Sequence, residues 1–181
     1  DVDETWVSTD CPEIRRVSLE HGSKVIDRPS KLADNIIMPD ESLVHFAENI
    51  PFDILIFIQP TSPFVSPSII NKAISLITKK GFDSGFTANR QHWKPLWDNN
   101  LNPIDWEINY RPRRQDRPTL YSENGMLYVT RKKILMESRL RYGGKIGIVE
   151  TNSLESIDIN THDDFEFAEM IAKAKYINNE L

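Results

Sequence analysis

Apolar residues recur along the chain with two periods, one typical of strands and one typical of helices, and the two alternate. The clearest strand pattern, at 52–59, is apolar on both faces. Such a run predicts a strand in the middle of a parallel sheet, with helices on each side. At 66–79, five apolar residues between Ile69 and Ile77 recur at helical spacing, which predicts an amphipathic helix.

Weaker patterns of the same two kinds fill most of the remaining chain. Pro12 favours a first helical turn, and Thr161 is a candidate N-cap with Asp163 and Asp164 in the turn that follows. The further predicted strands are 4–9, 24–26, 83–88, 126–129, 145–150 and 156–159, and the further predicted helices begin at Pro12, span 40–49 and span 161–177. Alternating strands and helices predict an α/β fold with a mostly parallel, doubly wound sheet.

The segment 89–122 interrupts this alternation. It contains three of the four tryptophans (Trp93, Trp97 and Trp106) and five arginines, and it has no clear period. A long excursion inside a compact domain is commonly functional, and exposed aromatic and arginine side chains suit a subunit interface. We therefore expect residues 1–181 to form one domain with 89–122 as an inserted excursion.

Composition excludes several classes of protein. With 22 Lys and Arg against 27 Asp and Glu, the formal net charge is -5, which argues against general nucleic-acid binding. The longest wholly aliphatic or aromatic run, 54–58, is far too short to cross a bilayer. The single cysteine, Cys11, excludes an internal disulfide and fits a reducing compartment. We expect neither a nucleic acid nor a membrane as a partner.

The turn after the longest apolar strand is the first candidate site. Open α/β sheets bind ligands beyond the carboxyl ends of their strands, and the segment Gln-Pro-Thr-Ser-Pro at 59–63 lies at such an end. Gln59 would be the last strand residue to face the crevice. A rigid loop whose glutamine satisfies backbone groups explains the same residues equally well.

An arginine-rich segment at 111–117 is the second candidate. Pro112 and Pro118 bias the residues before them to extended conformations, so the arginines should splay apart. Guanidinium groups bind phosphate or carboxylate through paired hydrogen bonds. An anion site, a solvated basic stretch and a nuclear import signal are all open at this point.

A metal site at 156–160 is the third candidate. In a strand, Asp158 and Asn160 would share one face while Ile157 and Ile159 are buried on the other. Two oxygen ligands at a strand end suit Mg²⁺, which takes few protein ligands and completes its shell with phosphates and waters. The alternative is that both polar residues cap the next turn and helix.

A series of short motifs, each weak alone, is specific in its order and spacing. These motifs are Val-Ser-Thr-Asp at 7–10, Arg-Pro at 28–29, Gln-Pro-Thr-Ser-Pro at 59–63, Asp-Ser at 83–84, Arg-Pro-Arg-Arg-Gln-Asp at 111–116, Glu-Asn-Gly at 123–125 with Tyr128, Gly-Gly-Lys at 143–145 and Ser-Ile-Asp-Ile at 156–159. The series resembles the CMP-N-acylneuraminate synthetases (acylneuraminate cytidylyltransferases), especially their animal branch. The resemblance runs from about Trp6 to Ala168 and implies a Rossmann-like nucleotidyltransferase fold.

The resemblance also implies a reaction and its substrates. The 2-hydroxyl of a sialic acid would attack the α-phosphate of CTP, with Mg²⁺ as cofactor, to give CMP-sialic acid and pyrophosphate. By position, Arg28 would contact the cytidine part and Gln59 would bind the sugar. Arginines and Mg²⁺ would stabilise the charge that develops on the transferred nucleotide.

The remaining roles follow from the same resemblance. Catalytic roles fall to Arg113, Arg114 and Asp158, substrate contacts fall to Arg111, Gln115, Asn124 and Tyr128, and the metal ligands would be Asp158 and Asn160. In the family, the excursion corresponding to 89–122 packs against a second subunit and reaches its active site, so we expect a homodimer.

Three departures from the family qualify these expectations. Asn160 stands where the family has a second metal aspartate, and Ile37 and Pro39 align with serines that meet the nucleotide. The family begins with a strand and a loop that holds the CTP phosphates, for which these residues contain no counterpart. We therefore expect a truncated chain that does not turn over CTP as given.

Two other functions are open. One is a cytidylyltransferase for a different acidic keto-sugar, and the other is a non-catalytic paralogue or fragment that dimerises and binds sugar. The compartment is expected to be nuclear or cytoplasmic. Tyr110 replaces the lysine that usually precedes the arginine segment, which weakens its interpretation as a nuclear signal.

Overall fold

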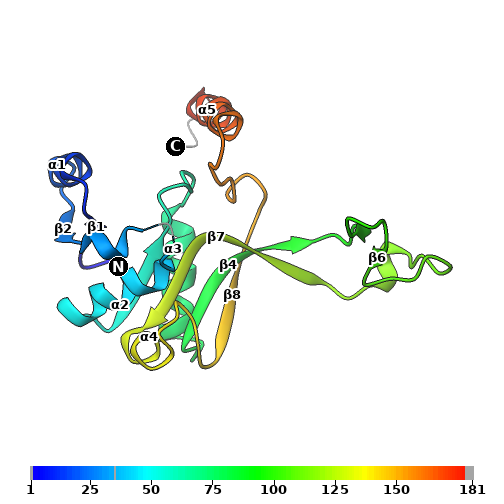
Figure 1. Cartoon of the computed structure of the whole chain (residues 1–181), viewed down its shortest axis with the longest axis horizontal. Helices are drawn as coiled ribbons and strands as arrows, with labels where there is room; N and C mark the ends of the chain where they lie inside the picture. The colour runs from blue at the N-terminus through cyan, green and yellow to red at the C-terminus, as the bar shows by residue number, and fades with distance from the viewer. Residues whose placement is uncertain (1, 35, 178–181) are drawn as a thin grey trace. The chain divides into compact units, whose positions relative to one another are not determined.

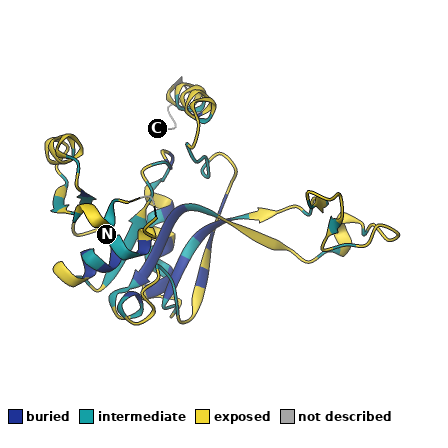
Figure 2. Ribbon diagram, in the orientation of Figure 1, coloured by how far each residue is buried: buried dark blue, intermediate teal, exposed yellow. Residues whose placement is uncertain are grey.

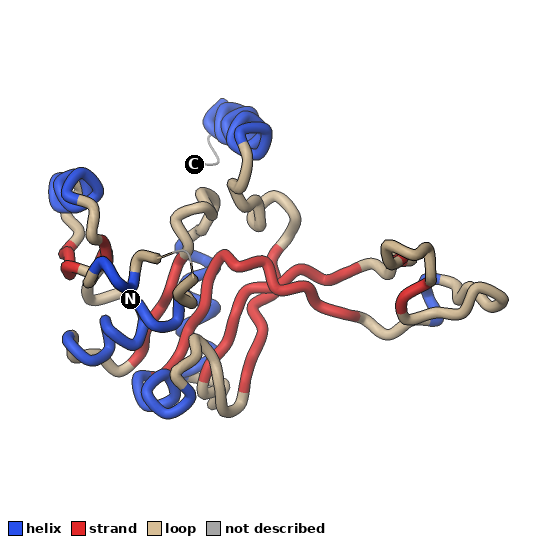
Figure 3. The backbone as a smooth tube through the Cα atoms, viewed as in Figure 1, coloured by secondary structure: helices blue, strands red, loops and turns tan. Residues whose placement is uncertain are grey.

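The structure is a computed structural model that describes residues 2–34 and 36–177. Figure 1 traces the chain, and Figure 3 colours its helices and strands. In chain order the elements are β1 (Trp6–Thr9), α1 (Pro12–Glu20), β2 (Lys24–Asp27), the 3-10 turn η1 (Ser30–Leu32), α2 (Pro39–Asn49), β3 (Ile54–Ile58), α3 (Pro67–Thr78), β4 (Ser84–Gln91), β5 (Leu96–Trp97), β6 (Pro103–Ile104), the 3-10 turn η2 (Arg114–Asp116), β7 (Leu120–Arg131), α4 (Lys132–Ser138), β8 (Ile146–Thr151) and α5 (His162–Ile177).

The chain divides into two compact units. Unit 1 comprises Asp1–Gln59, Val65–Phe86 and Leu127–Val149, and unit 2 comprises Pro60–Phe64, Thr87–Met126 and Glu150–Leu181. The strands pair in a four-stranded sheet with the order β3-β7-β4-β8, in the parallel pair β1-β2 and in the antiparallel pair β5-β6. Among the described residues, none of the helices combines the length and apolarity needed to cross a membrane.

The hydrophobic core of unit 1 forms where helices pack on the sheet. Leu43, Val44 and Ala47 of α2 cluster with Leu135 of α4, and partly buried residues of β3, Leu55 among them, pack against that cluster. On α3 the buried side chains recur at helical spacing; Ile69, Ala73 and Ile77 are among the predicted residues, and Leu76 is a further one. Figure 2 shows the buried positions concentrated along β7 and neighbouring strands.

The position of β3 in the sheet differs from the sequence-based expectation. The apolar strand was predicted to lie in the middle of a parallel sheet, but in the described residues it stands at the end of the strand order. It pairs antiparallel with β7, with Ile56 opposite Val129. An apolar run reports burial on both faces and carries no information about the direction of the partner strand, which comes from residues more than 60 positions later.

The helices that carry cap signals form where the sequence places them. Pro12 occupies the first turn of α1, and the Ser66 hydroxyl accepts a hydrogen bond from the backbone N–H of Ile69 at the start of α3. At the start of α5, Thr161 and Asp164 bond reciprocally: the Thr161 hydroxyl accepts from the Asp164 N–H at 3.2 Å, and the Asp164 carboxylate accepts from the Thr161 N–H at 2.8 Å.

Other predicted and observed elements disagree. The strand predicted at 156–159 is a turn and loop. Four residues of alternation are too few to specify a strand when the side chains of Ser156 and Asp158 serve turns and caps instead. The sequence also did not predict α4, which is short and begins after Arg131 with no side-chain cap.

Two of the family motifs fit against each other in unit 1. The Ser84 hydroxyl donates to the backbone C=O of Gly143 at 2.7 Å and accepts from its N–H at 2.9 Å. Gly144 has φ +61°, and a Cβ there would lie 2.7 Å from Oδ2 of Asp83, which accepts from the Lys145 N–H. The motifs Asp-Ser and Gly-Gly-Lys therefore form one closed loop junction that has no room for a side chain at Gly144.

In unit 2 the excursion has its own small aromatic cluster. The antiparallel pair of β5 and β6 carries Trp97, whose ring meets that of Trp106 at 5.0 Å between centroids, and Trp106 also meets Trp93 at 6.4 Å. The indole N–H of Trp106 donates to the backbone C=O of Leu96 at 3.2 Å. Much apolar surface of the excursion stays exposed; the exposed large residues include Leu96, Trp97, Leu101, Ile104, Ile108 and Tyr110.

Candidate functional site

In unit 1, β1 and β2 bring two family motifs together. Arg28 follows β2; its backbone N–H donates to the C=O of Thr9 at 3.0 Å, and its guanidinium donates to Asp10 at 3.2 Å. The Nε of Arg28 is buried and, within the described residues, has no hydrogen-bond partner. Arg28 is therefore anchored at the carboxyl ends of the parallel pair and keeps a donor for a ligand.

Gln59 is the last residue of its segment of unit 1 and is half-buried directly after β3. The turn that follows it belongs to unit 2. There, the backbone C=O of Thr61 accepts a hydrogen bond from the N–H of Ile159 at 2.9 Å. This bond holds the Gln-Pro-Thr-Ser-Pro turn against the loop that carries Asp158 and Asn160, so two of the predicted site motifs are neighbours in unit 2.

The arginine segment separates into residues with different surroundings. Arg113 donates to both carboxylate oxygens of Asp116, at 2.7 and 3.0 Å. Arg111 is exposed. Arg114 and Gln115 line a pocket of about 360 Å³ in unit 2, which we call the arginine pocket. Its lining residues are Arg90, Gln91, His92, Trp93, Arg114, Gln115, Arg117, Pro118 and Thr119.

Asn124 is held in a network of side chains rather than facing solvent. Its amide oxygen accepts from the Thr87 hydroxyl at 2.7 Å. Its amide nitrogen donates to Asn89 at 2.7 Å, Thr151 at 2.8 Å and Ser156 at 3.1 Å. All five residues belong to unit 2, where Asn124 ties together β4, β7, β8 and the following turn.

Tyr128 is 4% exposed in the core of unit 1. Its ring stacks on Phe57 at 6.0 Å between centroids, and the guanidinium of Arg141 lies over it at 4.8 Å. Arg141 donates to both carboxylate oxygens of Asp40, with the shortest distance 2.6 Å. Tyr128 is therefore packed between the ring of Phe57 and the buried ion pair of Arg141 and Asp40. Sequence reasoning did not predict this ion pair.

This ion pair sets the ionisation of the buried carboxyl. Burial of Asp40 opposes its charged form, but the side-chain and backbone hydrogen bonds and the positive charge of Arg141 together outweigh burial and hold the pKa of Asp40 below its usual value. Hydrogen bonding to Asp40 in turn raises the pKa of Arg141, so both groups stay charged at neutral pH.

The predicted metal residues are adjacent although they do not lie in a strand. The amide nitrogen of Asn160 donates to Oδ2 of Asp158 at 2.8 Å. Oδ1 of Asp158 is buried and accepts no hydrogen bond from the residues that the structure describes. That oxygen fits a cation ligand. No cluster of three or more His, Cys, Asp or Glu able to hold a metal occurs in residues 2–34 and 36–177.

The same loop leads into α5 through the Thr161 and Asp164 cap. Hydrogen bonds from the Thr161 side chain, then from the backbone N–H groups of Asn160 and Thr161, lower the pKa of the Asp164 carboxyl. Asp164 is thereby kept as an acceptor at the helix start, and its contacts fix the backbone on either side of Asn160.

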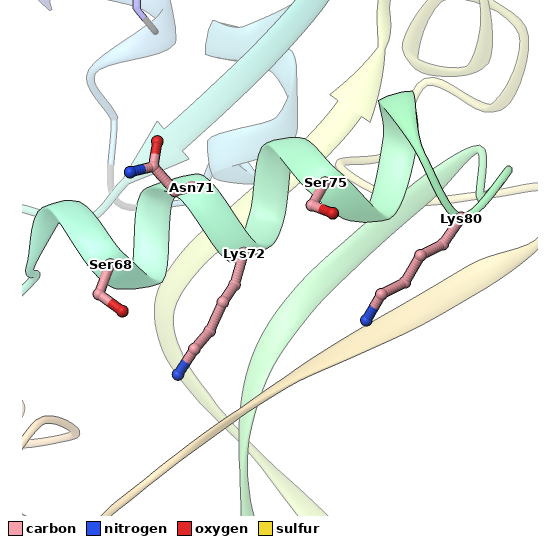
Figure 4. A pocket seen from close by; sticks show the side chains of 5 residues that line it. All are labelled: Ser68, Asn71, Lys72, Ser75 and Lys80. Carbon is pink, nitrogen blue, oxygen red and sulfur yellow. The ribbon is translucent and has the colours of Figure 1, made fainter.

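A second hollow lies along the exposed side of α3 in unit 1. It is open, has a volume of about 570 Å³ and is lined by Ser68, Asn71, Lys72, Ser75 and Lys80. In Figure 4 the side chains of Lys72 and Lys80 point to the same side of the helix. Surface lysines and hydroxyls of this kind hold no group in a fixed geometry, and none of the five residues was predicted as functional.

Several residues of the site escaped sequence reasoning. Arg90 and Trp93 line the arginine pocket, and Arg117 stacks on Trp93 with its guanidinium carbon 5.4 Å from the ring. Arg117 lies more than 20 positions after Arg90 and Trp93 in the chain, and only the return of β7 beside β4 brings it to them. The arginine content of 111–117 was the one available signal, and it did not separate Arg117 from its neighbours.

Comparisons with known proteins bear on the family. The sequence profile of a cytidylyltransferase family matches residues 1–181. N-acylneuraminate cytidylyltransferases B and A of Danio rerio are 38% and 35% identical to the chain over 93% and 91% of it. The CMP-N,N'-diacetyllegionaminic acid synthase of Legionella pneumophila is 28% identical over 93% of the chain and 78% of its own length. The chain spans only about 40% of the length of the two fish proteins.

Solved structures agree on the fold. A CMP:2-keto-3-deoxy-manno-octonic acid synthetase complexed with CTP matches 96% of the chain with a TM-score of 0.68 at 15% identity. A 4-diphosphocytidyl-2C-methyl-D-erythritol synthase from Anaerococcus prevotii matches 95% with a TM-score of 0.69 at 13% identity. At these identities the likeness concerns the fold alone, and it confirms the predicted Rossmann-like nucleotidyltransferase class.

Proposed function

Since the chain belongs to the cytidylyltransferase family, we propose that the protein transfers the cytidylyl group of CTP to an N-acylneuraminate, a sialic acid, and releases pyrophosphate. The observation that carries the proposal is the arginine pocket, where Arg114 and Gln115 of the family motif meet Arg90 in a cavity of about 360 Å³. Both substrates are anions, and guanidinium groups bind carboxylate and phosphate with matched geometry. The similarity to fish proteins named for this activity supports the choice of sugar.

The proposed reaction assigns work to residues of each unit. Arg28, anchored on Asp10 with a free Nε, binds the cytidine part, and Gln59 binds the sugar where β3 ends. In unit 2, Arg114 stabilises the charge that develops on the transferred phosphate, and Gln115 contacts the sugar. Arg111 and Arg113 supply further positive charge, and Asp116 orients Arg113 through two hydrogen bonds.

Asn124 and Tyr128 have indirect parts in this scheme. The amide of Asn124 bonds Thr87, Asn89 and Thr151 within unit 2, and Tyr128 stacks on Phe57 within the core of unit 1. In this proposal each residue supports sugar binding by holding the structure of its own unit.

For the cofactor we propose Mg²⁺ on Asp158 and Asn160. Mg²⁺ would neutralise charge on the nucleotide phosphates. Asp158 offers a buried oxygen without a partner, and Asn160 would turn its amide oxygen, rather than its nitrogen, toward the same place. Because the pair has one charge fewer than two aspartates, Asn160→Asp should lower the Mg²⁺ concentration needed for half-maximal rate.

A homodimer is part of the proposal. The exposed apolar residues of the excursion, such as Leu96 at 59% and Ile108 at 65% exposed, are the surface that a second copy would cover. Sedimentation equilibrium of the full-length protein tests this, and a monomer at micromolar concentration refutes it. A nuclear or cytoplasmic location belongs to the same proposal.

One assay tests the reaction. The full-length protein is incubated with CTP, Mg²⁺ and N-acetylneuraminic acid, and pyrophosphate and CMP-sugar are followed together. Formation of both supports the proposal. Product with a diacetyllegionaminic acid but not with N-acetylneuraminic acid would shift the substrate toward that of the Legionella relative. Sugar binding without product from any acidic nine-carbon sugar would favour the non-catalytic paralogue.

A further inference from the structure

The arginine pocket contains more positive charge than the proposed sugar contact needs. Arg90, Arg114 and Arg117 all line it, and none of its nine lining residues is acidic. Asp116, the carboxylate nearest in sequence, is engaged by Arg113. Within the part of the chain that the structure describes, no hydrogen bond or ion pair engages the guanidinium of Arg90, Arg114 or Arg117.

Arg117 is the most informative of the three. Its Nε is buried, and no acceptor among the described residues bonds it. A buried donor without an acceptor is unfavourable, so such groups commonly mark a place where a ligand or ion binds. Stacking on Trp93 fixes the plane of the guanidinium before any ligand arrives. Arg117 is thus oriented and unsatisfied at the same time.

Charge balance then selects the class of ligand. A single carboxylate would neutralise one of three guanidinium groups, whereas a diphosphate neutralises two or more and offers several oxygens to separate arginines. The volume of about 360 Å³ lies near the lower limit for ligand pockets, which suits a compact polyanion. We propose that the arginine pocket binds a phosphate-bearing anion with at least two negative charges, and that Arg90 and Arg117 bind it together with Arg114.

The proposal goes beyond the function given above, in which Arg90, Trp93 and Arg117 are assigned no contact with a substrate. It rests on that function only for the source of the diphosphate, which would be the released pyrophosphate or the phosphates of CTP. The two sources share one chemistry and differ in what else they carry, so binding measurements can distinguish them.

Isothermal titration calorimetry of the full-length protein tests the site with inorganic pyrophosphate, CTP and N-acetylneuraminic acid as separate probes. We expect pyrophosphate to bind, and Arg90→Gln and Arg117→Gln each to weaken it about tenfold, the effect of removing one charge-assisted contact. Arg117→Lys, which keeps the charge without the fork, should recover part of the loss. Arg16→Gln on α1 makes the same charge change on an exposed helix of unit 1 and should leave the affinity within about twofold.

Each outcome bears on the proposal. An equal loss for pyrophosphate and CTP points to a shared diphosphate subsite, and a loss for pyrophosphate alone points to the free product; both support the site. The proposal is overturned if wild-type protein does not bind pyrophosphate, if both variants bind it like wild type, or if only N-acetylneuraminic acid is affected. Arg90 is exposed, so Arg90→Gln keeps the test valid even if Arg117→Gln unfolds.

Turnover measured on the same proteins separates this proposal from the proposed function. If wild-type protein makes no CMP-sugar but binds pyrophosphate through Arg90 and Arg117, the function fails and the site stands. If CMP-sugar is made and both variants bind pyrophosphate like wild type, the function stands and the site fails.

Discussion

Among the described residues, two arginines stack on aromatic rings, one in each unit, and they differ in which acceptors their N–H groups bond. Arg141 in unit 1 lies over the rings of Tyr128 and Phe57 and forms an ion pair with Asp40. The side chain of Arg141 is 13% exposed and that of Asp40 is 5% exposed. Arg117 in unit 2 lies over Trp93 and has a buried Nε with no acceptor among the described residues. The same stacking thus completes a core in one unit and prepares a binding surface in the other.

The comparison separates stability from function on physical grounds. A guanidinium that bonds a buried carboxylate has less capacity left for a ligand, whereas one oriented by a ring alone keeps that capacity. We therefore expect changes around Arg141 to appear in unfolding experiments and changes in the arginine pocket to appear in binding and turnover. The predictions below test that division.

The largest effect on stability is expected at the buried ion pair of Asp40 and Arg141. Asp40→Asn leaves the guanidinium of Arg141 buried without its countercharge, which should lower the free energy of unfolding by about 3–5 kcal/mol. Urea denaturation measures it. As a matched control, Glu41→Gln on the same helix removes an exposed ion pair with Arg139 and should cost about 0–1 kcal/mol. If the two variants unfold at the same urea concentration, the pair of Asp40 and Arg141 does not hold the core of unit 1.

The next effect is on catalysis. Arg114→Ala should reduce formation of CMP-sugar about 100-fold or more, near 3 kcal/mol in the transition state, while leaving the urea midpoint close to wild type. Arg113→Ala should lose less activity, because the Arg113 guanidinium is held by Asp116 and does not line the pocket. Equal losses in the two variants, or retained activity in Arg114→Ala, would remove the distinction between them.

A smaller effect on stability is expected at the loop junction of Asp83 and Ser84 with residues 143–145, close after Arg141 in the chain. Gly144 and Gly81 both have positive φ, so alanine costs about 1–2 kcal/mol at either position from backbone strain. At Gly144 the new Cβ would also meet Asp83 at 2.7 Å, whereas at Gly81 nothing lies within 4 Å. Gly144→Ala should therefore unfold at a lower urea concentration than Gly81→Ala. Identical midpoints would mean that the loop yields easily and that its closure does not fix Arg141.

How far the sequence could anticipate this arrangement depends on the range of each interaction. The starts of α1 and α5 follow from Pro12 and Thr161, because a first-turn proline and a cap both act within about three residues. The edge position of β3 could not follow, because its partner lies far along the chain. The predicted strand at 156–159 failed since its polar residues bond to near neighbours in turns.

The candidate site shows the same division. Motif residues such as Arg28 and Asp158 lie where ligand chemistry is plausible, each with a buried polar atom that the described residues leave unpartnered. In contrast, the contacts of Arg90 and Trp93 with the segment of Arg117 require the return of β7 beside β4, which no local pattern encodes. The buried pair of Asp40 and Arg141 joins residues 101 positions apart and is equally invisible to periodicity.

The smallest effect concerns acid. Because the pKa of Asp40 lies below its usual value in the folded protein, its contribution to stability is complete above the pKa of an unfolded aspartate, about 3.9, and is lost as the pH falls through the folded value. Wild-type protein should therefore lose stability as the pH falls below about 4, and Asp40→Asn should lose less over the same interval. Urea midpoints at several pH values measure this slope.

Asp164 provides the contrast from unit 2. Its pKa is also lowered, through the hydrogen bonds of the α5 cap, but the group is exposed, and water can replace those bonds when the carboxyl protonates. Asp164→Asn should therefore change the acid slope less than Asp40→Asn does. A larger change for Asp164→Asn would place the acid-sensitive interaction in the α5 cap of unit 2. The ion pair of Asp40 and Arg141 in unit 1 would then not be the main source of the loss of stability in acid.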